Sequence, residues 1–111
     1  MAKRNEFVDY LLELLEPLEG VSAKSMFGGF GIFKDGLMFG LVADDTLYFK
    51  VDDFNRFEFE RLELGLFMYM KGDKPMPMSY YKAPEAALDS PDEMQAWAKS
   101  AFEAALRAKK K

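Results

Sequence analysis

The sequence predicts a small α+β domain built around an antiparallel β-meander that runs from Met26 to Asp52. The strongest signal is Asp35-Gly36, a dipeptide typical of tight hairpin turns, which lies between two apolar runs. Amphipathic segments with helical spacing flank the meander on both sides. The 111 residues suffice for one core and are too few for two, so we expect one domain over 1–111, ending in a basic tail at 107–111.

The two turns of the meander fix its predicted strand pairing. With Asp35-Gly36 as the first loop, the expected partners are Phe33 with Met38, Ile32 with Phe39, Gly31 with Gly40 and Phe30 with Leu41. A second turn at Asp44-Asp45 pairs Val42 with Leu47, Leu41 with Tyr48 and Gly40 with Phe49.

Alternation of side chains along these strands predicts two different sheet faces. The face assigned to the core holds Phe33, Met38, Val42, Leu47, Phe49 and Val51. The opposite face is also too apolar to be left entirely in water, and we predict that it is an interaction face, formed by Phe30, Ile32, Leu37, Phe39, Leu41 and Tyr48. Lys34 and Lys50 are expected at its rim.

Helices and further strands are predicted outside the meander. Asn5 caps a first helix with an apolar stripe that ends between about Leu15 and Glu19, and a first strand follows at 21–27. After Val51, a short helix capped by Asp52 or Asp53 carries Phe54, Phe57 and Arg61. A second hairpin pairs 66–70 with 76–82 around Gly72-Asp73.

The clearest helix start is Ser90-Pro91-Asp92-Glu93, a capping box with proline at the first helical position. Met94, Trp97 and three alanines lie along one face of this last helix. We expect Trp97 to be largely buried against the sheet.

The composition restricts the possible chemistry, because the chain contains neither cysteine nor histidine. Ser-His and Cys-His catalysis are therefore excluded, and so are zinc sites other than carboxylate ones. Gly28, Gly29 and Gly31 are not followed by the Lys-Ser pair and helix of a phosphate loop, so we interpret them as sites of a bulge or close backbone approach. No catalytic residue, metal or cofactor is predicted.

One alternative remains, a small ligand-binding domain or enzyme that uses the region of Tyr80 and Lys82. A lysine with a lowered pKa could act there as a base. On a strand, however, Tyr80 and Lys82 lie on one side and Ser79 and Tyr81 on the other. A buried pocket around Lys82 would favour this alternative.

The charge distribution argues against autonomous binding of DNA. The net charge is −4, although the C-terminal residues include Arg107, Lys109, Lys110 and Lys111. An acidic body repels phosphate. We therefore expect at most weak DNA binding that depends on the tail, which we interpret as a solvated helix end. The N-terminus does not resemble a signal peptide and no apolar run could span a bilayer, so a cytoplasmic protein without membrane contact is expected.

An ordered set of motifs resembles the N-terminal domain family of the bacterial competence regulators TfoX/Sxy. The set comprises MFGG, DG, LYFKVD, Asn55-Arg56, MSYY, PE, LD and a Trp-Ala pair in the last helix. The similarity covers nearly the whole chain. It implies a two-layer fold of the secretion-chaperone-like type, with an antiparallel sheet of about five to six strands and helices on one side.

The resemblance also implies a function. In full-length competence regulators this domain precedes a helical C-terminal domain, and the protein acts as a co-activator with the cyclic-AMP receptor protein. We therefore expect a non-enzymatic regulatory domain that binds a protein, either a second copy in a homodimer or a transcription-related partner.

Overall fold

Helices begin and end the described chain, and the short strands between them follow one another in two groups, as expected for an α+β protein. The structure, a computed structural model, describes residues 6–26 and 29–109, without the side chains of residues 69–71 and 75–78. The elements are α1 (Glu6–Leu14), β1 (Val21–Met26), β2 (Gly29–Lys34), β3 (Leu37–Ala43), β4 (Thr46–Lys50), α2 (Arg56–Arg61), β5 (Leu66–Lys71), β6 (Lys74–Lys82), α3 (Glu85–Asp89) and α4 (Pro91–Lys109). Asn5, Phe27 and Gly28, to which the sequence assigned a cap, a strand end and a loop, lie outside the described residues.

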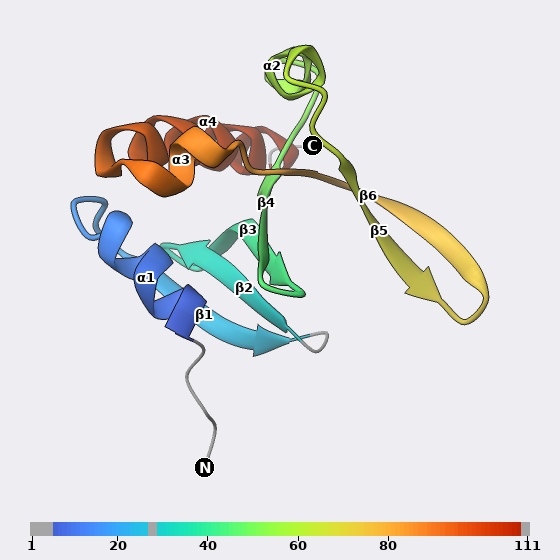
Figure 1. The fold of residues 1–111 in the computed structure, drawn as a ribbon, viewed down its shortest axis with the longest axis horizontal. Coiled ribbons are helices and arrows are strands. Elements are labelled where there is room, and N and C mark those ends of the chain that lie inside the picture. Colours follow the sequence, from blue (N-terminus) through green and yellow to red (C-terminus); the bar gives the residue numbers. More distant parts are fainter. Residues whose placement is uncertain (1–5, 27–28, 110–111) are drawn as a thin grey trace.

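The six strands form one antiparallel sheet in the order β1-β2-β3-β4-β6-β5. The first four follow each other as a meander, and α2 carries the chain to the edge strand β5 (Figure 1). The predicted α+β fold and second hairpin are confirmed. β6 pairs with β4 only at Tyr80, Tyr81 and Lys82, so its first part and β5 project from the body as an arm (Figure 1).

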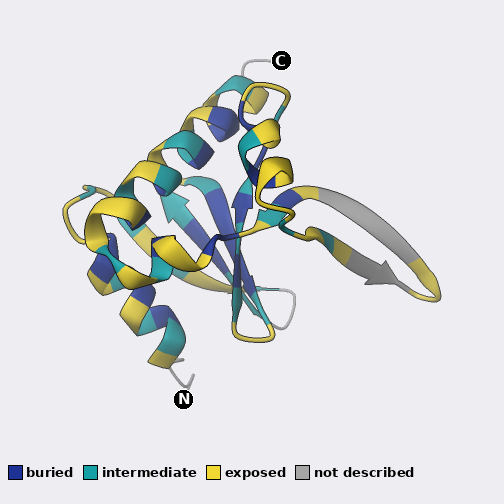
Figure 2. Ribbon diagram, turned by 45° about the horizontal axis from the view of Figure 1, so that its top comes forward, coloured by how far each residue is buried: buried dark blue, intermediate teal, exposed yellow. Residues whose placement is uncertain are grey.

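The helices α1, α3 and α4 lie on one side of the sheet (Figure 1). α4 packs on β3 and β4 through its buried stripe, which consists of Met94, Ala98, Ala101, Ala104 and Ala105. The alanines let the helix axis approach the strands closely, and Figure 2 shows this stripe facing inward along the helix. α1 contributes Val8, Leu11 and Leu14 to the same core.

The strand pairing differs from the prediction at one point of the β2–β3 hairpin. Phe33 faces Met38 as expected, but Ile32 then faces Gly40 instead of Phe39. Phe39 is therefore the extra residue of a β-bulge, and every pair beyond it is shifted by one position. The β3–β4 pairing, including Leu41 with Tyr48 and Val42 with Leu47, is as predicted.

The bulge exchanges the sheet faces that had been assigned to β2 and part of β3. Ile32 and Phe39 are each only 1 % exposed and belong to the core, where the Phe39 ring meets Phe102 of α4 edge-on at 6.2 Å. Phe30 and Leu37 also pack against this core. The prediction that these four side chains share an exposed face with Leu41 and Tyr48 is wrong.

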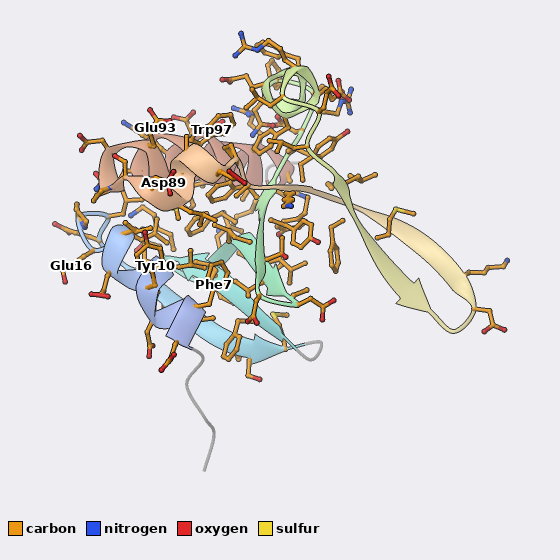
Figure 3. The ribbon with its side chains drawn as sticks, viewed as in Figure 1. Phe7, Tyr10, Glu16, Asp89, Glu93 and Trp97 are labelled. Carbon is orange, nitrogen blue, oxygen red and sulfur yellow. The ribbon has the colours of Figure 1, made fainter. Side chains whose placement is uncertain are left out.

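Trp97 is only partly buried on the outer side of the helical layer (Figure 3). Its ring packs edge-on against Phe59 of α2 at 5.0 Å, and its indole nitrogen donates to Glu93, one turn earlier, at 3.3 Å. The expected burial of Trp97 against the sheet is therefore corrected to a contact between α4 and α2.

A hydrogen bond also joins two helices of this layer. Tyr10 of α1 donates its hydroxyl proton to the carbonyl of Leu88, which connects α1 to α3.

Candidate interaction surface

The side of the sheet without helices has a defined set of residues, which we call the open face. The register and contacts of the strands place on it Lys24, Met26, Gly31, Phe33, Met38, Leu41, Tyr48, Lys50, Phe67, Tyr80 and Lys82. Leu41 and Tyr48 were predicted for an interaction face, whereas Phe33 and Met38 were assigned to the core. Two of the six predicted residues therefore lie on this side of the sheet, but Leu41 is only 2 % exposed, so only Tyr48 is accessible to a partner.

Gly31 lies under an apolar platform formed by Met26, Phe33 and Met38. A Cβ atom at Gly31 would lie 2.5 Å from the Met26 sulfur, 2.8 Å from the Phe33 ring and 2.9 Å from the Met38 sulfur. Only glycine leaves room for these three side chains to close over the strand. The close backbone approach predicted for these glycines is confirmed at Gly29, where a Cβ atom would collide with the Val42 carbonyl oxygen, whereas side chains approach Gly31. The platform itself is partly exposed. Methionine adapts to partners of different shape, so two sulfurs beside a ring make a suitable docking surface.

Aromatic side chains continue this surface toward the arm. The Tyr48 and Phe67 rings meet edge-on with centroids 4.8 Å apart, and the Lys50 ammonium lies 5.4 Å from the centre of the Tyr80 ring. Tyr80 is 6 % exposed, and its burial raises the pKa of the phenol to about 12. Tyr80 therefore stays protonated at neutral pH and supports the surface by packing.

Electrostatically, the sheet is the basic part of an acidic protein. The strands contain six of the 15 basic residues, all lysines, and none of the 19 acidic ones. Lys24 and Lys82 are exposed on the open face, and Lys50 is partly exposed there. Within the described part of the chain, none of these three lysines forms an ion pair.

The geometry does not favour a catalytic site at Tyr80 and Lys82. Tyr81 points to the helical side, where its hydroxyl donates to Glu60 at 3.1 Å and its ring contacts Phe59. The four polar groups of Ser79 to Lys82 are thus divided between two faces, as the alternation predicted. Among the described residues, no cluster of carboxylates could hold a metal ion.

A polar junction that the sequence did not reveal joins β4, α2 and α4. Asn55 is 4 % exposed, and its side-chain oxygen accepts from the Asp52 amide at 2.8 Å while its nitrogen donates to the Lys50 carbonyl and the Ser100 hydroxyl. Arg107 donates two hydrogen bonds to the Asp52 carboxylate, and this lowers the pKa of Asp52. These side chains bond to one another and to nearby backbone groups, so we interpret the junction as structural.

Arg107 is consequently not part of a free basic tail. Its guanidinium also lies 4.7 Å from the centre of the Phe54 ring, and α4 continues to Lys109. The short helix α2 begins at Arg56, later than predicted, so Phe54 precedes it and the buried anchor is Phe59. Asx-type capping is present, because the Asp52 carboxylate accepts from the Phe54 amide at 3.0 Å.

Comparisons with known proteins agree with this architecture. A family model described as the TfoX N-terminal domain matches residues 13–105. The comparison with curated proteins found no significant match. Within the described residues, no helix is long and apolar enough to cross a membrane.

Proposed function

Because this chain belongs to the TfoX N-terminal domain family, whose members are competence-related regulatory domains, we propose that it is a non-enzymatic regulatory module that binds a transcription-related protein through the open face. The family match covers 13–105, so the whole sheet and α4 as far as Ala105 belong to the matched region. The proposed activity of the chain is to bind this protein, and the identity of the partner determines which process is regulated.

The platform of Met26, Phe33 and Met38 carries this proposal. One side of the sheet is covered by helices, whereas the platform is partly exposed on the other side and is continuous with Tyr48 across the strands. Adaptable apolar side chains with unpaired lysines beside them are typical of a binding surface with an apolar centre and a polar rim.

Affinity capture with matched variants tests the proposal. The tagged full chain is incubated with lysate of its native cells, with and without nuclease, and retained proteins are quantified by mass spectrometry. Phe33→Glu places a charge on the platform, and Phe57→Glu makes the same kind of change on α2, where Phe57 is 59 % exposed. We expect a transcription-related protein to be retained after nuclease treatment by wild type and Phe57→Glu, and lost with Phe33→Glu.

Folding is checked by circular dichroism for both variants, since only folded protein is informative. Equal retention by folded Phe33→Glu would contradict binding through the open face. Retention that disappears with nuclease in every variant would indicate a nucleic-acid bridge and would contradict a protein partner.

A further inference from the structure

Five residues of the open face form a continuous row across the strands. Lys24, Gly31, Leu41, Tyr48 and Lys82 are successive Cα partners from β1 through β2, β3 and β4 to β6. The row therefore begins and ends with an exposed lysine and is apolar between them, where Gly31 and Leu41 are buried and Tyr48 is partly exposed. Neighbouring strands lie about 4.8 Å apart, so the two lysine Cα atoms are separated by up to about 19 Å along the sheet.

The ends of this row are the places where a negative partner is favoured. Acidic residues are absent from every strand, and Lys24 and Lys82 form no ion pair with a described residue. Elsewhere the protein is acidic, with an overall net charge of −4. A partner of opposite charge is therefore directed to the open face and repelled by the helical side.

The chemistry of the centre favours a protein segment over a single-stranded nucleic acid. Bases bind to sheets by stacking on free aromatic faces. Here the Tyr80 ring is occupied by the Lys50 ammonium, and Tyr48 and Phe67 are packed edge-on against each other. The Phe33 ring and the sulfurs of Met26 and Met38 all lie close over Gly31. Aliphatic and aromatic side chains of a peptide can pack between these groups, whereas stacked bases need the rings to be displaced.

We infer that the open face binds a segment of a partner protein that has an apolar centre and carboxylates near both ends, which pair with Lys24 and Lys82. This inference rests on the proposed function and specifies its partner. The spacing between the acidic groups follows from the row: about 13 residues for a helical segment and about six for an extended one. The segment's apolar residues lie on Tyr48 and the adjoining platform, which are partly exposed.

A peptide selection with charge reversal tests the inference. The full chain is used to select binders from a phage-displayed library of random peptides of about 16 residues, long enough to span the row as a helix. Affinities of the selected peptides are then measured for wild type, for Lys24→Glu/Lys82→Glu and for Lys99→Glu/Lys109→Glu. The second pair changes the net charge equally on α4, where both lysines are exposed, and serves as the control.

We expect the selected peptides to carry Asp or Glu on both sides of an apolar centre. Their affinity should fall about tenfold or more for Lys24→Glu/Lys82→Glu and change little for the control. Peptides in which the acidic residues are replaced by lysine should then prefer the Lys24→Glu/Lys82→Glu protein to wild type. Selected peptides without flanking acids, or equal affinities for wild type and Lys24→Glu/Lys82→Glu, would overturn the inference.

Two further measurements test whether a nucleic acid or a second copy of the chain, instead of a peptide, binds the open face. An oligothymidylate of about 20 nucleotides is titrated against the same proteins, and light scattering follows self-association. Tight binding of the oligonucleotide that depends on Lys24 and Lys82 would overturn the inference in favour of a single strand, and a dimer that blocks peptide binding would overturn it in favour of a second copy. If affinity capture of the native partner depends on Phe33 but peptide affinity does not depend on Lys24 and Lys82, this inference alone is refuted. If capture of the native partner does not depend on Phe33, the proposed function is refuted.

Discussion

Replacing Phe39 and Phe33 separately by alanine tests the β-bulge that determines which side chains are available for binding. Phe39 is 1 % exposed and meets Phe102 of α4 edge-on, so Phe39→Ala leaves a cavity between sheet and helix. Such a change costs about 3–5 kcal/mol, a large part of the roughly 5–15 kcal/mol expected for a domain of this size. Phe33 is partly exposed on the open face, so Phe33→Ala should cost only about 1–2 kcal/mol.

The assay is urea unfolding followed by far-ultraviolet circular dichroism, with Trp97 fluorescence as a second probe because its ring contacts Phe59. Coincident transitions would justify a two-state free energy. A regular hairpin without the bulge predicts the opposite order, with Phe33 in the core and Phe39 exposed. A loss below about 1 kcal/mol for Phe39→Ala together with one above about 3 kcal/mol for Phe33→Ala would refute the bulge and the assignment of the open face.

Three further predictions concern the helical side. Trp97→Ala should reduce the free energy of unfolding by about 1–3 kcal/mol, less than for a fully buried tryptophan, because the ring is only partly buried against Phe59; a loss above about 4 kcal/mol in urea titrations would contradict this placement. Asn55→Ala should cost about 2–3 kcal/mol, since it removes three hydrogen bonds at a buried position, and an unchanged urea midpoint would show that water replaces them. The pKa of Asp52 is lowered from its ordinary value of 3.8 by Arg107, so the ion pair stabilises the fold above about pH 4 and is lost as pH falls through the folded-state pKa. Unfolding measured between about pH 6 and pH 3 should therefore show a smaller pH-dependent loss for Asp52→Asn than for wild type, and identical slopes would argue against the pair.

The sequence was sufficient for the architecture because its local signals were strong. The turn at Asp35-Gly36, the second turn at Asp44-Asp45 and the capping box from Ser90 each specify a backbone conformation within a few residues. Asp35, Asp44 and Asp45 indeed have positive φ. The family resemblance is likewise supported by the match over 13–105.

The faces of the sheet could not be obtained in the same way. One extra residue in β3 places Phe39 with Gly40 opposite Ile32, and Phe39 is apolar like its neighbours, so the pattern contains no sign of the bulge. Residues of both β2 and β3 were consequently assigned to the wrong face of the sheet. Leu41 and Tyr48 were placed with the uncovered side because the β3–β4 turn was predicted with its observed register.

The open face and the Asn55 junction also depend on contacts distant in sequence. Asn55 and Ser100 are 45 positions apart, and Arg107 reaches Asp52 across 55. Lys24 and Lys82 become the two ends of one row only after five strands are placed in order. A signal was nevertheless present, since lysine is the only charged residue type in the strands.

Methyl NMR on methionine-labelled protein tests most directly whether the open face is the binding surface. Met26 and Met38 lie on the platform over Gly31, whereas Met94 belongs to the buried stripe of α4. The labelled protein is titrated with the partner identified by affinity capture. We predict that the methyl signals of Met26 and Met38 shift or broaden while the signal of Met94 stays in place. Binding that leaves Met26 and Met38 unchanged would contradict the assignment of function to this face.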